Sequence, residues 1–319
     1  MTTSNDTITV GIAGLTGKFA RLIASCLLQQ PNVAIRGYVR DPTKLPSWLV
    51  ESDAVHIIRG GAFDTSAARV FAKGCDVIIC GYLGNNEFMI EGQKVLIDAC
   101  SMEGVPRYIA SDYCLNFTKL EKGQLFPKDP MIEVKKYLES KDVKGVHVLI
   151  GAFMDTLFSA YFQIWDGREK SLTFWGNEDS IWESTTYKNA AGFVAAVAVD
   201  RTAVGVKKFL GDRRSMREIA DLFQSAYGFR PQLKRLGSLD DVFKHMHELK
   251  TKYPEEPMRY MAMFYQYYCI NGQCYLGEFA NLDNSTYSQV KPEGFKEFFA
   301  RTPVETLGEA MANAGNVSG

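Results

Sequence analysis

Over its first 150 residues, the chain alternates short apolar runs rich in valine and isoleucine with amphipathic stretches. This alternation is typical of strand–helix–strand units that build a parallel sheet. We predict six strands, at Ile8–Ile12, Val33–Val39, Val55–Ile58, Val77–Cys80, Arg107–Ala110 and Val146–Ile150. We predict helices between them, at Phe19–Gln30, Ser66–Lys73, Glu87–Glu103 and Pro130–Ser140, where apolar residues lie three and four apart. The sequence therefore predicts an α/β fold with a Rossmann-type doubly wound parallel sheet.

The regular alternation ends after Gly151. Aromatic and leucine residues then recur every four positions and predict one apolar helix, with Phe153, Leu157, Tyr161 and Trp165 on the same face. Further elements are expected as a strand near Leu172–Trp175, an alanine-rich helix at Lys188–Asp200, a strand at Val206–Leu210 and a helix that begins at the capping box Ser215–Glu218. We predict two closely packed domains, residues 1–150 and a smaller α/β lobe at residues 151–319, with Val206–Leu210 as a candidate to join the first sheet.

The composition argues against several kinds of partner. The chain has 36 basic and 37 acidic residues and a net charge of −1, so it offers no positive field to nucleic acid or an anionic membrane. No apolar run reaches the roughly 18 to 20 residues of a membrane span, and the N-terminus lacks a signal-peptide core, so we expect a cytoplasmic protein. The seven cysteines are odd in number and scattered, which predicts free buried thiols and no metal site.

A glycine-rich turn, Gly11-Ile-Ala-Gly14-Leu-Thr-Gly17, follows the first predicted strand and opens a helix. Glycines permit a tight turn and a close approach of the backbone to a pyrophosphate, and the helix N-terminus supplies free N–H groups. We predict that a dinucleotide binds here, at Gly11, Gly14, Leu15, Thr16, Gly17 and Lys18. A tight turn without a ligand and a solvent-exposed Lys18 are the alternatives.

Basic residues follow the second predicted strand, where enzymes that use NAD place an acid on the ribose. The Arg40 guanidinium can stack on adenine and pair with a 2′-phosphate, and Lys44 can add charge to the same phosphate. These residues favour NADP(H), so residues 1–150 are predicted to be an NADP(H)-binding domain. A solvated pair of basic side chains is the alternative, and Asp41 could contact a ribose hydroxyl.

The turn after the fourth predicted strand begins with Cys80 and Gly81. It lies at the carboxyl end of the sheet, where ligands of doubly wound folds bind, and we expect both residues to line the cofactor. The alternative is an ordinary loop in which Asn86 caps the next helix.

Several segments together resemble one known family. They are the glycine turn, Val39–Pro42, Val105–Tyr113, Phe174–Asn177 and, later, the stretch from Gly211 to Gly228. Over nearly its whole length the sequence resembles the NmrA-like and isoflavone-reductase-like atypical short-chain dehydrogenases. This resemblance implies an NADP(H)-binding Rossmann domain, a small C-terminal substrate lobe, and a cleft between them for an aromatic or apolar small molecule. The family includes reductases of aromatic metabolites, and also members that bind the dinucleotide without turnover.

The resemblance implies a catalytic lysine early in the helix after the fifth strand, but here that position falls on Met131, which cannot donate a proton. Lys128 is the nearest substitute, although after Pro127 it could be an exposed loop lysine. Ser111 and Tyr113 follow the fifth strand, near where the nicotinamide should lie. We predict Tyr113, Ser111 and Lys128 as candidate catalytic residues, with a wall of the pocket as the alternative role for Tyr113.

The segment Met258–Tyr268 is apolar on nearly every face, so its helix should be buried. Its methionines and aromatics could shape a pocket for a flat ligand, or they could form core or a subunit interface in a homodimer. We predict a pocket for a small apolar or aromatic substrate, lined by Met131, Phe153, Tyr161, Met261 and Tyr265.

Three functions follow from these predictions. The first is an NADPH-dependent oxidoreductase that reduces a carbonyl, imine or benzylic carbon of an aromatic or conjugated metabolite in secondary metabolism. In such an enzyme the cofactor carries the hydride, and the protein supplies orientation, water exclusion and a proton. The second is a non-redox isomerase or cyclase on the same scaffold. The third is a catalytically silent regulator that senses NADP(H).

Overall fold

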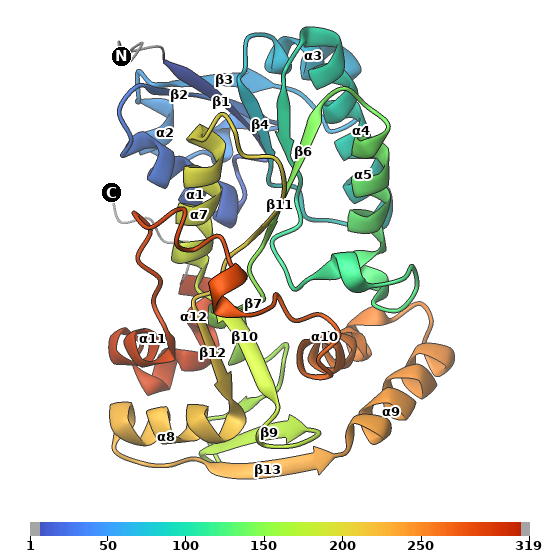
Figure 1. Ribbon diagram of the computed structural model, residues 1–319, viewed down its shortest axis with the longest axis vertical. Coiled ribbons are helices and arrows are strands. Elements are labelled where there is room, and N and C mark those ends of the chain that lie inside the picture. Colours follow the sequence, from blue (N-terminus) through green and yellow to red (C-terminus); the bar gives the residue numbers. More distant parts are fainter. Residues whose placement is uncertain (1–6, 314–319) are drawn as a thin grey trace.

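The computed structural model describes residues 7–313 (Figure 1). Residues 1–6 of the first predicted domain and residues 314–319 of the second lie outside this range. A parallel sheet of seven strands forms one half of the molecule, in the order β11-β6-β5-β4-β1-β2-β3. Its strands are β1 (Ile8–Ala13), β2 (Val33–Val39), β3 (Val55–Arg59), β4 (Val77–Cys80), β5 (Arg107–Ile109), β6 (Lys144–Leu149) and β11 (Gly205–Lys208). The predicted Rossmann-type sheet is confirmed, and the order reverses between β1 and β4, where such folds bind their ligands.

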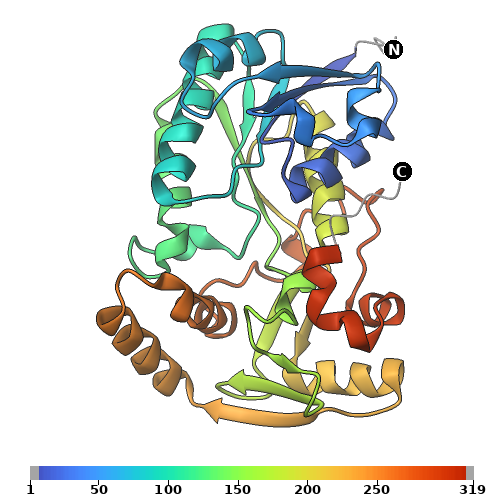
Figure 2. The same ribbon diagram turned by 180° about the vertical axis from the view of Figure 1, so that it is seen from behind.

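Helices cover both faces of this sheet (Figures 1 and 2). The helices α3 (Thr65–Ala72), α4 (Asn86–Glu103) and α5 (Asp129–Glu139) pack side by side on one face. On the other face α1 (Lys18–Leu28) packs against α7 (Tyr187–Val199), and the short α2 (Ser47–Val50) lies near β3. The chain thus returns to the large sheet twice after residue 150, because α7 packs against α1 and β11 pairs with β6.

The other half contains two small sheets and several helices. One sheet joins β12 (Asp212–Ser215), β10 (Ile181–Thr185) and β7 (Ala152–Phe153), and the other joins β13 (Gln232–Gly237), β9 (Ser171–Trp175) and β8 (Trp165–Asp166). The helices are α6 (Met154–Leu157), α8 (Met216–Tyr227), α9 (Leu239–Lys252), α10 (Met261–Ile270), α11 (Phe295–Arg301) and α12 (Ala310–Asn313). Within residues 7–313 no helix has both the length and the apolar character to cross a membrane.

The aromatic helix predicted from Phe153 to Trp165 is wrong. The structure has one helical turn, α6, and the chain then reverses at Gln163, whose φ is 56°. This reversal lets Trp165 pair with Leu172 across the β8–β9 hairpin, while Phe158 packs against Phe299 of α11. Strand pairing and tertiary packing therefore override the local four-residue spacing.

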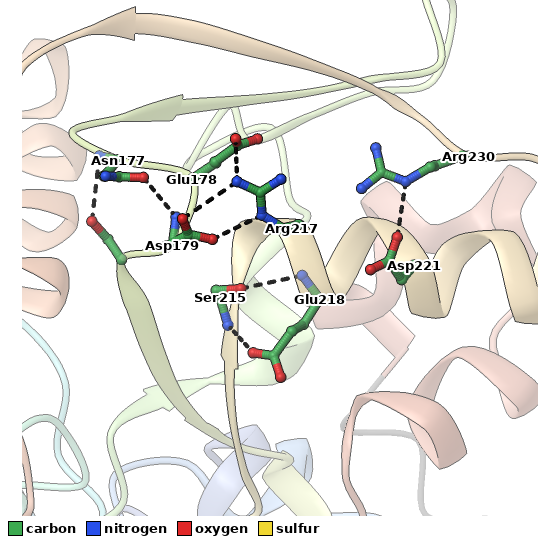
Figure 3. Close-up of polar contacts among 9 residues, drawn as sticks. Asn177, Glu178, Asp179, Ser215, Arg217, Glu218, Asp221 and Arg230 are labelled. Atoms are coloured by element: carbon green, nitrogen blue, oxygen red, sulfur yellow. Dashed lines mark hydrogen bonds and ion pairs between the residues drawn. The ribbon is translucent and has the colours of Figure 1, made fainter.

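The capping box predicted at the start of α8 is confirmed (Figure 3). The Ser215 hydroxyl accepts a hydrogen bond from the Glu218 N–H at 3.2 Å, and the Glu218 carboxylate accepts one from the Ser215 N–H at 2.8 Å. In the same first turn of the helix, Arg217 pairs with Asp179 at 2.9 Å and with Glu178. These ion pairs connect the β9–β10 turn to the start of α8.

Candidate functional site

The turn after β1 has the geometry that binds a pyrophosphate. Gly14 has φ +79°, its N–H donates to the Tyr38 carbonyl at 2.9 Å, and a Cβ on it would lie 3.1 Å from the Gly81 carbonyl oxygen. Gly17 is the N-cap of α1, has no side chain to cap the helix, and is followed by a first turn without acidic residues. The N–H groups at the start of α1 are therefore available to an anion.

The remaining residues of the predicted loop have different roles. Gly11 lies inside β1, where a Cβ would come within 2.9 Å of Ile78, so it serves close packing. The Leu15 side chain is fully buried over Gly37 and points into the core, whereas Thr16 is half-buried. The Lys18 ammonium donates to the Ala312 carbonyl of α12 at 2.6 Å.

Cations gather at the carboxyl ends of β2 and β3. Arg40 and Lys44 are exposed just beyond β2, and Arg59 ends β3, where its neighbour across the sheet is Val39. The Asp41 carboxylate accepts hydrogen bonds from the Thr43 hydroxyl at 2.6 Å and the Thr43 N–H at 3.1 Å. These bonds, with Lys44 and Arg59 nearby, hold the pKa of Asp41 below its usual range. The Asp41 carboxylate is thus engaged as a turn cap. The sequence analysis did not predict Arg59 as a site residue, because only the pairing of β2 with β3 brings it to the end of β2.

A cavity of about 600 Å³ extends from the start of α1 to α10. Nine predicted site residues line it, namely Gly81, Ser111, Tyr113, Lys128, Met131, Phe153, Tyr161, Met261 and Tyr265. The glycine turn, Arg40, Lys44 and Cys80 are not part of the cavity lining. The cavity therefore joins residues that the sequence separates by more than 180 positions, and it begins beside the turn after β1.

An aromatic cluster forms the end of the cavity nearest to the glycine turn. The rings of Phe153 and Tyr187 stack with centroids 4.1 Å apart and an angle of 3° between their planes. Phe19 contacts both, and it meets Tyr113 edge-on at 4.8 Å. Phe19 and Tyr187 were not predicted; Phe19 lies two residues after Gly17, so its position in the first turn of α1 was the available signal.

The loop after β5 is tied to the loop after β4 through two hydroxyl groups. Ser111 donates to the Tyr82 carbonyl at 2.7 Å, and Tyr113 donates to the Cys80 carbonyl at 3.0 Å. Burial raises the pKa of Tyr113 well above its usual range, and burial raises the pKa of the Cys80 thiol to about 12. Both hydroxyl protons are thus held by backbone carbonyls, and the Cys80 thiol stays neutral. The neighbouring helix α4 has Asn85 as its N-cap, one residue before Asn86, the cap named in the alternative interpretation of this loop.

Lys128 is buried, so its interpretation as an exposed loop lysine is wrong. It is the N-cap of α5, is 7% exposed, and lines the cavity one helical turn before Met131. Its ammonium lies 5.2 Å from the centre of the Tyr265 ring on α10. Burial by itself lowers the pKa of Lys128, but Cys114, Tyr265 and Asp112 together hold it above the usual lysine value. A cation is therefore present in the cavity, one turn away from the position that the resemblance implied.

The described residues contain no group of three or more histidine, cysteine, aspartate or glutamate side chains that could hold a metal ion. All seven cysteines are free, and only Cys26 is not fully buried.

At the rim of the cavity Leu83 is 91% exposed, and Met258 is also exposed. The chemistry of the lining is therefore that of an apolar, aromatic cavity with one ammonium group, from Lys128, and one carboxylate, from Asp112.

Comparisons with solved structures identify relatives of the same fold. The structure resembles isoflavone reductase at a TM-score of 0.73 and 15% identity, covering 92% of this chain and 98% of that one. It resembles AtPrR2, solved with NADP+ and (+)-pinoresinol, at a TM-score of 0.76 and 14% identity, with coverage of 92% and 98%. It resembles the NADPH-dependent quinone oxidoreductase of Escherichia coli, solved with NADPH, at a TM-score of 0.69 and 17% identity, with coverage of 91% and 98%.

No curated protein sequence matches this chain. The model of the NmrA-like family, however, matches residues 4–299, which include the glycine turn, the loop after β5 and helix α10. The resemblance inferred from the sequence is therefore confirmed, and the chain belongs to the NmrA-like family.

Proposed function

We propose that this protein is an NADPH-dependent reductase that transfers hydride to a small aromatic or conjugated substrate held in the cavity. The observation that carries the proposal is the cavity itself, which runs from Phe19 and Gly81 beside the glycine turn to Lys128. Membership of the NmrA-like family and the neighbours solved with NADP(H) support the same conclusion.

The residues at the turn fit an NADP(H) molecule. The uncapped N-terminus of α1 would receive the pyrophosphate, and Arg40, Lys44 and Arg59 would surround a 2′-phosphate. Because Asp41 is engaged by Thr43, it competes weakly for a ribose hydroxyl, which favours NADP(H) over NAD(H). When bound, the cofactor supplies the hydride.

The chain's own residues would position the substrate and supply the proton. The stacked Phe153 and Tyr187 rings offer a flat apolar surface at the cofactor end. Lys128 is the only cationic side chain among the described residues that line the cavity, so it would donate a hydrogen bond and then a proton to a substrate oxygen. We assign Ser111 and Tyr113 to the wall, because backbone carbonyls already accept their hydroxyl protons.

The test is calorimetric titration with NADPH, NADP+ and NADH, followed by NADPH oxidation with 9,10-phenanthrenequinone, an isoflavone and pinoresinol as probes. Lys128→Met is expected to lower kcat by about 10² to 10⁴ without changing NADPH affinity. The matched control is Lys141→Met, just beyond α5, because Lys141 pairs with Asp98 at 2.7 Å and does not line the cavity.

Each outcome separates the hypotheses. Substrate-dependent oxidation of NADPH supports the reductase. Conversion of a probe without NADPH consumption would replace it with the isomerase or cyclase, and tight NADPH binding without any turnover would replace it with the regulator. Absence of binding to all three nucleotides would overturn the reductase and the regulator together.

A further inference from the structure

A buried hydrogen bond between a carboxylate and an imidazole lies at the cavity wall, between Asp112 in the loop after β5 and His147 on β6. Asp112 Oδ2 lies 2.6 Å from His147 Nδ1, and the side chains are 1% and 5% exposed. Since an ionised carboxylate can only accept, the Nδ1–H of His147 is the donor. The other carboxylate oxygen, Asp112 Oδ1, is buried and has no hydrogen-bond partner among the described residues. A buried carboxylate with an unpartnered oxygen is unfavourable unless a positive charge lies nearby.

The backbone of this loop is strained at the residue that follows Asp112. Tyr113 has φ +35°, a region that non-glycine residues rarely adopt. The hydroxyl groups of Ser111 and Tyr113, on either side of Asp112, hold the strained turn against the loop after β4. His147 is itself fixed by the edge of the Phe117 ring, at a centroid distance of 6.1 Å. The fold therefore maintains the position of the Asp112 carboxylate at a cost in free energy.

Lys128 is the only cationic side chain among the described residues that line the same cavity as Asp112. The titratable groups that face its ammonium come from three segments: Asp112 and Cys114 from the loop after β5, Tyr161 from the segment before β8, and Tyr265 and Cys269 from α10. Burial raises the pKa of Cys114 to about 11, and it also raises the pKa of Tyr161 and Cys269. Asp112 is the only carboxylate among the described residues that line the cavity.

We propose that Asp112 is the counter-charge that keeps Lys128 ionised inside the cavity, and that His147 holds the Asp112 carboxylate in place. Both are positioning residues, because they act through Lys128. Their effect on catalysis rests on the proposed reductase function, whereas the charge coupling between Asp112 and Lys128 does not.

The coupling is tested by NMR on protein labelled with ¹³Cε-lysine, in which the Lys128→Arg variant identifies the Lys128 signal. In the wild-type protein this signal is expected to keep the chemical shift of an ammonium group up to pH 10.5, the ordinary pKa of lysine. In Asp112→Asn it should move toward the neutral amine at least about one pH unit lower. Asp98→Asn is the matched control, because Asp98 pairs with Lys141 outside the cavity, and it should leave the Lys128 signal unchanged. A Lys128 signal with the same pH dependence in Asp112→Asn and the wild type would overturn the proposal.

If Asp112→Asn does not fold, the same coupling can be measured from the titration of Asp112 in Lys128→Met. Because coupling is reciprocal, Lys128→Met should raise the pH at which the ¹³Cγ signal of Asp112 titrates. An unchanged Asp112 titration in Lys128→Met would contradict the proposal.

The consequence for catalysis is tested separately with 9,10-phenanthrenequinone. If the wild type reduces it, the high-pH limb of kcat/KM should move to lower pH in Asp112→Asn, while the KM for NADPH stays the same. A quinone that no variant reduces would count against the reductase function, and the NMR titrations would still decide the charge coupling.

Discussion

The ammonium of Lys128 lies 5.2 Å from the centre of the Tyr265 ring, and the two residues meet across the cavity from different halves of the molecule. Lys128 caps α5 beside the large sheet, whereas Tyr265 comes from α10 in the other half. This contact joins the two halves of the molecule at the site where the substrate is proposed to bind.

Removal of the Tyr265 hydroxyl should weaken the activity that depends on Lys128. We expect Tyr265→Phe to lower kcat with the quinone probe by about tenfold, because the ammonium loses a polar neighbour that orients it. Tyr267→Phe is the control, since Tyr267 also lies on α10 but does not line the cavity and is absent from the groups that act on Lys128. Equal losses of kcat in both variants would show that Tyr265 has no special role.

The turn after β1 should not tolerate a side chain at Gly14. In Gly14→Ala, the left-handed backbone conformation would cost about 1–2 kcal/mol of stability. The new Cβ would also lie only 3.1 Å from the Gly81 carbonyl oxygen. Gly74→Ala shares the positive φ of +78° but has open space around it, and Gly61→Ala has open space without a positive φ. In urea unfolding, Gly14→Ala should therefore lose the most stability, Gly74→Ala less, and Gly61→Ala the least. Only Gly14→Ala should also lose NADPH binding. NADPH binding that survives in Gly14→Ala would contradict the predicted turn.

Charge at the end of β2 should select the phosphorylated cofactor. In calorimetry, Arg40→Ala is expected to weaken NADPH binding by about tenfold or more and to leave NADH binding nearly unchanged. Arg230→Ala controls for the loss of an exposed arginine, because Arg230 pairs with Asp221 at 2.9 Å on α8 (Figure 3). If NADPH and NADH lose equal affinity in Arg40→Ala, the residue does not read the 2′-phosphate.

Restoring a lysine at the position implied by the family should damage this protein. Met131 is buried in the same cavity as Lys128, so Met131→Lys would place a second ammonium in an apolar site that has one counter-charge. We expect a loss of about 3 kcal/mol or more in the free energy of unfolding and no gain in activity. Met131→Leu, which conserves volume, should cost less than about 1.5 kcal/mol. A stable and more active Met131→Lys would show that Lys128 does not replace the family lysine.

Buried tyrosines should make the fold sensitive to alkali. Burial and the nearby Asp64 raise the pKa of Tyr38 to about 12, and its hydroxyl donates to the Gly61 carbonyl at 2.8 Å. Because the folded pKa exceeds the unfolded value of 10.0, this group stabilises the fold fully below pH 10, and its contribution is lost as the pH rises toward 12. The difference in urea midpoint between wild type and Tyr38→Phe should therefore shrink from pH 8 to pH 11.5. Tyr253→Phe at the end of α9 is the control, and a constant difference for Tyr38→Phe would contradict the assignment.

Short-range pattern in the sequence predicts a large part of this protein. The strands of the large sheet, the glycine turn and the capping box at Ser215 follow from residues within a few positions of one another, since hydrophobic period, glycine content and helix caps are local properties. The resemblance to the NmrA-like family rests on the same local motifs, and the family model bears it out.

How distant segments meet depends on tertiary packing, which the local pattern does not predict. It replaced the aromatic helix with a hairpin, placed Arg59 beside the end of β2, and returned α7 and β11 to the large sheet. It also buried Lys128 against Tyr265 and paired Asp112 with His147, residues that are 137 and 35 positions apart. Burial, and the charge state that follows from it, depend on which surfaces are removed from water by packing, and no local pattern specifies that.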